Sequence, residues 1–255
     1  MTGDEYLRGV LNKYFVLTGQ GSVAYTAASQ VCPVIRKWAG GQLREIYFSG
    51  SYSKGTGIKG ETDVDLLISL KSDTTNTLKE LFEGLHSRMT TSGYPAARKQ
   101  HVSIHINHNG VDVDLVPGVK HEGNTEDHWL YVNRAGRERI QTNIDKHISL
   151  VRNSGRVDEI RVIKLWRKLH SLDICSFYLE LAVIEALNGY RSGQVASNVL
   201  RVLDYLRDDF AGARFVDPAN SNNIISDELT AQEKSVIAGQ ARISRLKQTW
   251  EEIVW

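Results

Sequence analysis

The sequence predicts an α+β fold, in which a mixed β-sheet packed by helices is joined to a helical lobe. Strand signals gather in the first half, at Ile46 to Phe48, Val64 to Leu70, His101 to Asn107 and Val111 to Val116. After Pro117-Gly118 nearly every segment has helical periodicity instead. Strands followed by helices are typical of an α+β lobe joined to a helical lobe. We therefore divide the chain into residues 1–120 and 121–255, with a ligand cleft expected between the lobes.

Three helices are expected around the first strands. Asp4 to Leu17 has apolar residues at helical spacing, and Ser22 to Trp38 does too, ending at Gly40-Gly41. Thr75 to Arg88 is the third, lying between two strands in sequence. The first two helices are also free to pack on the helical lobe.

The last two predicted strands form a hairpin. His101 to Asn107 and Val111 to Val116 both alternate, which is the period of a strand. Asn109-Gly110 stands between them, and Asn-Gly is a strong hairpin turn signal.

The second lobe is expected to consist of helices. The predicted segments are Glu126 to Asn133, Gln141 to Val151, Val157 to His170, Ser176 to Tyr190, Val195 to Phe210 and Thr230 to Ile253.

Composition is that of an ordinary soluble globular protein. Of 255 residues, 41% are hydrophobic and 24% are charged, and the formal net charge is +1. No global field therefore recruits nucleic acid or anionic membrane, and strong general nucleic-acid binding is not expected. Cys32 and Cys175 have no ligand-like spacing, so we expect two buried free thiols in a reducing compartment. The N-terminal residues do not form a signal peptide, and no long apolar run predicts a membrane span, so we expect a cytoplasmic protein.

Two carboxylates open the second strand. Asp63 and Asp65 point to the same face, because side chains alternate along a strand. Two such charges repel unless a cation lies between them, and a divalent metal is the simplest one. Just upstream, Gly50-Ser51 combines a small residue and a hydroxyl, which suits close approach to phosphate oxygens. The segment predicts a metal-dependent nucleotide-handling site.

A later strand offers a third carboxylate. Asp112 and Asp114 share one face of Gly110 to Gly118, and either could complete a cage with the first two acids. Two Mg²⁺ ions about 3.5–4 Å apart in such a cage would activate an attacking hydroxyl and stabilise the leaving oxygens. Magnesium prefers hard oxygen ligands and borrows some from substrate phosphates. We therefore expect two Mg²⁺ ions, for which Mn²⁺ can substitute.

These motifs resemble the DNA polymerase β-like nucleotidyltransferase superfamily. Gly50-Ser51, eleven residues, and then Asp63-Val64-Asp65 is similar to its signature. The segment Asp114 to Pro117 resembles the branch that holds oligoadenylate synthetases, archaeal CCA-adding enzymes and bacterial cyclic-oligonucleotide synthases (CD-NTases). The resemblance implies a polymerase-β-like lobe with the active site in the cleft beside a helical lobe. It favours Asp114 over Asp112 as the third metal ligand.

The resemblance continues in the helical half. Ile163 to Trp166 and Ser176 to Leu181 are similar to the helix pair that grips the nucleotide in that branch, and Phe215 to Asn223 resembles a loop of the same branch. It implies that Lys164 and Ser176 bind the triphosphate and that Phe177 stacks on a base. Gly50 and Ser51 would contact phosphates, while Asp63, Asp65 and Asp114 would hold metal.

These helical residues also have structural explanations. A lysine such as Lys164 is often a surface residue whose stem packs along the helix. Ser176 could instead cap the helix that begins at Phe177, and Phe177 could belong to the core.

The favoured function is condensation of nucleoside triphosphates, as donor and acceptor, into a cyclic di- or oligonucleotide second messenger with release of pyrophosphate. The resemblance points to bacterial anti-phage defence and leaves room for a regulatory protein partner. Linear oligoadenylate synthesis, or nucleotide addition to RNA ends or to a protein, is the alternative. A catalytically inactive NTP-binding regulator is a third reading.

Overall fold

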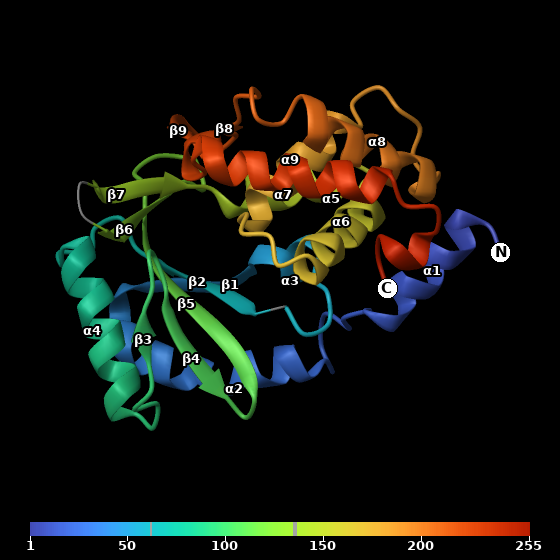
Figure 1. The fold of residues 1–255 in the computed structure, drawn as a ribbon. Helices are drawn as coiled ribbons and strands as arrows, with labels where there is room; N and C mark the ends of the chain where they lie inside the picture. Colours follow the sequence, from blue (N-terminus) through green and yellow to red (C-terminus); the bar gives the residue numbers. More distant parts are fainter. Residues whose placement is uncertain (62, 135–136) are drawn as a thin grey trace. The chain divides into compact units, whose positions relative to one another are not determined.

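A computed structural model describes residues 1–61, 63–134 and 137–255, except the side chain of Arg137, and the chain forms two compact units (Figure 1). One, here called the helical unit, contains Met1–Val16, Thr56–Gly60 and Ser149–Trp255. The other, the sheet unit, contains Leu17–Gly55 and Glu61–Ile148. The predicted α+β fold is confirmed.

A mixed sheet forms the centre of the sheet unit. Its strands run in the order β1-β2-β5-β4-β3, and β6 pairs with both β5 and β7. β2 and β5 are parallel, whereas the other pairs are antiparallel. The strands are β1 (Leu43–Ser49), β2 (Val64–Leu70), β3 (Arg98–Lys99), β4 (Ile104–His108), β5 (Val111–Lys120), β6 (His128–Arg134) and β7 (Arg137–Thr142).

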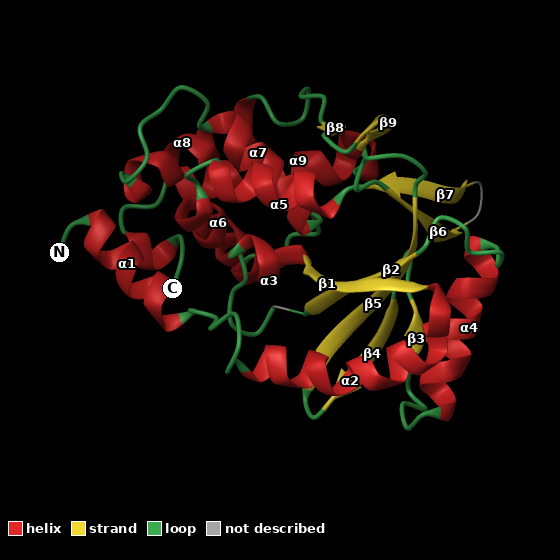
Figure 2. Cartoon of the chain, turned by 180° about the vertical axis from the view of Figure 1, so that it is seen from behind, coloured by secondary structure: helices red, strands yellow, loops and turns green. Residues whose placement is uncertain are grey.

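Two helices, α2 (Val23–Ala39) and α4 (Leu78–Thr91), pack against the central strands of this sheet (Figure 2). The strand residues in their shared core include Leu66, Ile68 and Leu115. Because side chains alternate, the residues between these positions lie on the opposite face of the sheet. That opposite face carries the acids of the candidate site.

The hairpin between β4 and β5 agrees with the prediction. Asn109 and Gly110 both have positive φ, 52° and 82°, as a two-residue type I′ turn requires. β5 continues past Pro117 to Lys120 and is longer than expected.

The predicted helix from Glu126 to Asn133 is wrong, because this segment contains β6. Burial alternates along it, with His128, Leu130 and Val132 buried and the residues between them half-buried. The following segment is β7, and α5 (Ile144–Asn153) begins only after it. The sheet unit therefore extends past residue 120, and its boundary falls within α5.

The helical unit is built mainly from long helices. They are α1 (Gly3–Lys13), α6 (Val157–Leu169), α7 (Ser176–Ala186), α8 (Val195–Asp208) and α9 (Ala231–Arg245), with a hairpin of β8 (Val216–Asp217) and β9 (Asn220–Ile224). Trp166, Tyr178 and Phe210 are among the largest side chains of the core. The two chain ends lie side by side, because Tyr6 donates a hydrogen bond to the carbonyl of Val254.

Several helices are shorter than the sequence predicts. α1 ends at Lys13, α7 at Ala186 and α9 at Arg245. The two cysteines are free as expected, but the expectation of burial is wrong, since Cys32 is half-buried and Cys175 is exposed. Among the described residues, no helix has the length and apolar character needed to cross a membrane.

A short helix, α3 (Gly50–Lys54), carries the Gly-Ser motif and is anchored by a buried tyrosine. The hydroxyl of Tyr52 accepts a hydrogen bond from the backbone N–H of Gly19 at 2.6 Å. It also lies 2.9 Å from the hydroxyl of Ser22, the N-cap of α2. The tyrosine ring contacts Phe48, which stacks on Tyr25. These contacts hold α3 against the start of α2.

We predict that Tyr52→Phe lowers the free energy of unfolding by about 1–3 kcal/mol, because buried Ser22 and the N–H of Gly19 lose a partner. Urea denaturation measures the change. Tyr47→Phe is the control, since its hydroxyl bonds to Arg44 in an exposed position. Equal stability of Tyr52→Phe and wild type would contradict this account of the anchor.

Candidate functional site

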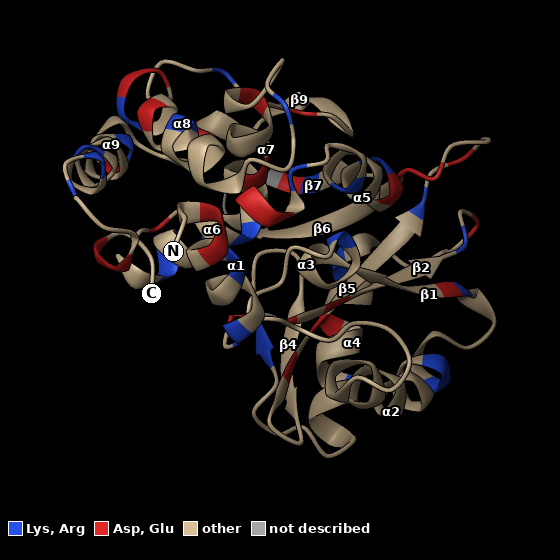
Figure 3. Ribbon diagram, turned by 90° about the vertical axis from the view of Figure 1, so that its right-hand side faces the viewer, with Lys and Arg blue, Asp and Glu red and all other residues tan. Residues whose placement is uncertain are grey.

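Two carboxylates lie beside each other at the centre of the sheet. Asp65 of β2 and Asp114 of β5 are register partners in the parallel pair. Both lie on the face opposite α2 and α4, since the buried neighbours Leu66 and Leu115 belong to the core under those helices. Acidic segments along β5 are visible in Figure 3. The structure thus brings together two of the three predicted metal ligands.

The third acid, Asp63, immediately precedes β2 and is exposed. Partial desolvation raises the pKa of its carboxyl, and the negative charges of Asp114 and Asp112 raise it further, while His105 and Arg98 act in the opposite direction. The field of Asp114 therefore reaches Asp63. Carboxylates that repel each other create a negative potential between them, and this potential stabilises a bound cation.

Gly50 is a position that only glycine can occupy. Its φ is +60°, and a Cβ added there would lie 1.7 Å from Oδ2 of Asp65. The backbone of α3 therefore lies directly against the Asp65 carboxylate. Ser51 follows within α3 and is half-buried. The predicted Gly-Ser pair is adjacent to the predicted metal ligands.

The donor set suits a hard divalent cation. Three carboxylates supply the oxygen ligands that Mg²⁺ prefers. Among the described residues, however, no three His, Cys, Asp or Glu side chains are grouped closely enough to hold one ion. Asp63 is the exposed acid of the three. The carboxylate oxygens fit the metal in their chemistry, and the metal-ligand assignment stays a prediction.

Sequence reasoning missed one residue of this region, His105 on β4. Its Nδ1 lies 2.9 Å from Oδ1 of Asp114, and its Nε2 lies 3.4 Å from Oδ1 of Asp112. Alternation along the strand puts His105 on the same face as the acids, so the pattern contained the signal. Asp114 is the more buried acid of β5, with 13% of its side chain exposed against 46% for Asp112.

Lys164 of α6 is buried rather than exposed. Its Nζ lies 2.7 Å from Oε1 of Glu180 and donates to the hydroxyl of Thr56 at 3.1 Å. Thr56 in turn donates to the same carboxylate oxygen at 2.6 Å. The surface-lysine explanation is therefore wrong. A phosphate contact by Lys164 competes with Glu180, and the predicted triphosphate role stays a prediction.

Ser176 and Phe177 begin α7 in the helical unit. The hydroxyl of Ser176 accepts a hydrogen bond from Arg167 at 3.1 Å, whereas the N-cap of α7 is Cys175. The alternative explanation of Ser176 as the cap is therefore wrong. Phe177 is half-buried and packs against the helical core. The predicted roles of Ser176 and Phe177 in binding nucleotide stay predictions.

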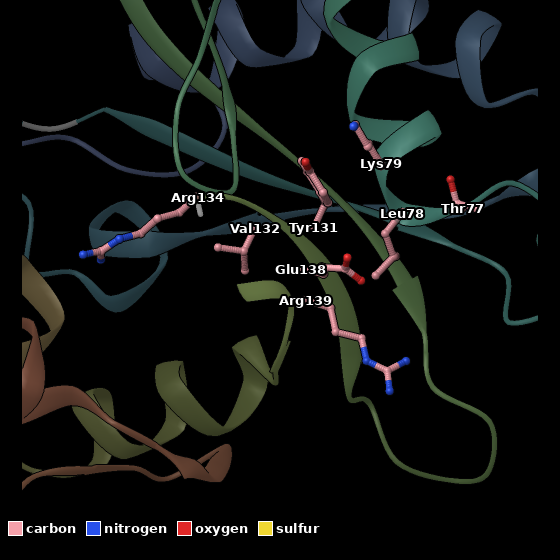
Figure 4. Close-up of a pocket in the computed structure, with 8 residues that line it drawn as sticks. All are labelled: Thr77, Leu78, Lys79, Tyr131, Val132, Arg134, Glu138 and Arg139. Carbon is pink, nitrogen blue, oxygen red and sulfur yellow. The ribbon is translucent and has the colours of Figure 1, made fainter. Parts of the chain in front are cut away.

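A cavity of about 690 Å³ lies elsewhere in the sheet unit (Figure 4). Its lining comes from the start of α4 and from β6 and β7, and includes Leu78, Lys79, Tyr131 and Arg139. None of the predicted site residues lines it. Cavity size therefore does not locate the candidate site, whose evidence is the arrangement of the acids.

The chain has an α+β fold similar to that of polymerase-β-like nucleotidyltransferases, with acids on neighbouring strands of its mixed sheet. Residues 29–154 match the model of SMODS, the Second Messenger Oligonucleotide or Dinucleotide Synthetase domain. This match includes Gly50, Ser51 and the three acids. The chain is therefore similar to this synthetase domain over residues 29–154. No curated protein sequence matches the chain.

Solved structures of similar fold match nearly the whole chain. CdnC in a HORMA-deltaN complex from E. coli MS115-1 is 19% identical with a TM-score of 0.76, and the match covers 95% of this chain and 89% of CdnC. The cyclic dinucleotide synthase CdnE of Elizabethkingia meningoseptica, with GTP and Apcpp, is 16% identical with a TM-score of 0.71. The match covers 94% of this chain and 97% of CdnE. CdnG of Bradyrhizobium diazoefficiens, with GTP, is 12% identical with a TM-score of 0.72, covering 96% and 92%. At these identities the likeness shows the fold.

We predict that Lys164→Met lowers the free energy of unfolding by about 3–5 kcal/mol, because it removes the ammonium that contacts the buried Glu180 carboxylate. Adding Glu180→Gln should recover most of the loss, since the double variant buries neither charge of the pair. Urea denaturation of both variants measures the two changes. If the free energy of unfolding of Lys164→Met lies within about 1 kcal/mol of the wild-type value, the pair of Lys164 and Glu180 is not buried in solution.

We predict that Asp63→Asn unfolds at a higher temperature than wild type at pH 7 without divalent cations. The raised pKa means that the ionised form is disfavoured in the folded state, so removing the charge stabilises the fold above that pKa. The increase in unfolding temperature should shrink as the pH falls through the raised pKa of Asp63. It should vanish below the ordinary pKa of 3.8, where the carboxyl is protonated in both the folded and the unfolded state. Asp73→Asn, an exposed carboxylate after β2, is the control. A Tm of Asp63→Asn at or below that of wild type at pH 7 would rule this out.

Proposed function

We propose that this protein condenses nucleoside triphosphates into a cyclic di- or oligonucleotide and releases pyrophosphate. The observation that carries the proposal is the register pairing of Asp65 with Asp114, beside a glycine whose backbone touches the Asp65 carboxylate. The SMODS match to the same residues supports a second-messenger product.

The chemistry proposed here relies on the acids and on Gly50-Ser51. Two Mg²⁺ ions, or Mn²⁺ in their place, would supply charge neutralisation at the reacting phosphate. Asp63, Asp65 and Asp114 would hold them through carboxylate oxygens. Asp114 would also help to activate the attacking hydroxyl, because a carboxylate can accept its proton.

The bond changes follow from this arrangement. The hydroxyl oxygen of the acceptor nucleotide forms a bond to the α-phosphorus of the donor, and the bond from that phosphorus to the bridging oxygen breaks. Pyrophosphate leaves with the electron pair, while the proton passes to the carboxylate. Phosphoryl-type transfer depends mainly on positioning and electrostatic stabilisation, so the chain needs no covalent nucleophile.

The proposed biological role is the production of a signal in bacterial anti-phage defence. The description of the matching family as a second-messenger synthetase supports a signalling product. One similar structure is a complex of CdnC with a HORMA protein, which supports a regulatory protein partner for this chain as well. The net charge of +1, with basic and acidic residues interspersed in Figure 3, supports nucleotides rather than long nucleic acids as substrates.

Incubation of the protein with labelled nucleoside triphosphates and Mg²⁺ or Mn²⁺, without RNA, tests the proposal. We expect pyrophosphate release and a product that resists phosphatase, because a cyclic product has no terminal phosphate. Asp63→Ala and Asp65→Ala should each lower the rate about a hundredfold or more, since several kcal/mol of charge stabilisation is lost. Asp73→Ala is the matched control and should retain full activity.

Three outcomes would contradict the proposal in different ways. A phosphatase-sensitive product would select linear oligonucleotide synthesis. A requirement for an RNA 3′ end or for a protein acceptor would select nucleotide addition to a macromolecule. Unchanged pyrophosphate release from the two alanine variants would overturn the metal-site assignment.

A further inference from the structure

His105 connects the two acids of β5 through its imidazole ring. Nδ1 faces Oδ1 of Asp114 at 2.9 Å, and Nε2 faces Oδ1 of Asp112 at 3.4 Å. An ionised carboxylate only accepts hydrogen bonds, so the ring nitrogen that faces Asp114 must donate. The ring is largely buried, with 10% of the side chain exposed, and does not belong to the apolar core under α2 and α4.

The network continues from His105 to the hairpin turn. Asp112 also accepts a hydrogen bond from Nδ2 of Asn107 at 2.8 Å. The side-chain carbonyl of Asn107 accepts from the backbone N–H of Gly110 at 3.0 Å. These residues alternate along β4 and β5, and His105 is the register partner of Asp114. A continuous series of polar contacts therefore leads from the turn to the third acid.

We propose that His105 is a positioning residue that orients the carboxylate of Asp114 for the catalytic cation. The proposal rests on the proposed function, because it assigns Asp114 as a metal ligand. By donating to Oδ1, His105 fixes the rotation of the carboxylate and leaves Oδ2 directed at the cation. Asp112 lies on the other side of the ring, with its Oδ1 3.4 Å from Nε2.

Such a contact has a measurable consequence for cation binding. Loss of a hydrogen bond that orients a metal ligand typically weakens metal affinity by 10-fold to 100-fold. A purely structural histidine would instead change thermal stability and leave cation affinity unaltered.

Mn²⁺ binding to the full-length protein without nucleotide, measured by calorimetry and by the paramagnetic resonance of free Mn²⁺, tests the proposal. We expect His105→Ala to raise the Kd for Mn²⁺ by about 10-fold to 100-fold. His105→Asn should remain within about threefold of wild type, because its amide nitrogen occupies the place of Nδ1 and keeps the bond to Asp114. In His105→Gln the amide nitrogen occupies the place of Nε2 and loses the bond to Asp114. The Kd of this variant for Mn²⁺ should therefore rise about tenfold or more.

The neighbouring His108 provides the matched control. It lies on the same strand but contacts Tyr94 and Gln30, so His108→Ala should bind Mn²⁺ as wild type does. Thermal denaturation of each sample identifies any variant that does not fold. If His105→Ala does not fold, the contrast between Asn and Gln decides the question.

Equal Mn²⁺ affinity of the Asn and Gln variants, or wild-type affinity of His105→Ala, would overturn the positioning role. Asp63→Asn and Asp65→Asn belong in the same assay. If these two variants lose Mn²⁺ and the His105 variants do not, the positioning role fails while the proposed function stands. If the Asp63 and Asp65 variants bind Mn²⁺ normally, the metal site of the proposed function fails.

Discussion

Parallel pairing of β2 with β5 is the constraint on which the candidate site depends. It places Asp65 and Asp114 at the same level of the sheet, on the face that α2 and α4 do not cover. A shift of one residue in either strand would send one acid into the core beneath those helices. The apolar neighbours, Leu66 and Leu115, fix the register because they have to be buried. Core packing on one face therefore sets the geometry of the acids on the other.

The same region carries features that are unfavourable for the fold by itself. Gly50 adopts a positive φ, and partial desolvation together with neighbouring negative charges raises the pKa of Asp63. Neighbouring like charges oppose folding, whereas they attract a divalent cation. Local features that are unfavourable for folding, such as these, are expected at functional sites. In this chain they coincide with the segment that matches the SMODS domain.

Period-2 alternation predicted the strands that carry the acids, because each has one strongly apolar face. It was not applied to β6, which was predicted as a helix, although burial alternates along it. No local sequence pattern predicts the pairing of Lys164 with Glu180, because it depends on the packing of α6 against α7. The contacts of His105 were missed for a related reason. Strand periodicity gives the face on which a side chain lies, but only the cross-strand register gives its partners.

The central claim is that Asp63, Asp65 and Asp114 together bind the cations that this chemistry needs. Anomalous diffraction from crystals grown with Mn²⁺ and a non-hydrolysable nucleoside triphosphate tests it most directly. The account predicts Mn²⁺ peaks within about 2.0–2.4 Å of carboxylate oxygens from all three residues, bridged to the nucleotide phosphates. A nucleotide bound with no Mn²⁺ at these acids, or with Mn²⁺ held by other residues, would contradict the account.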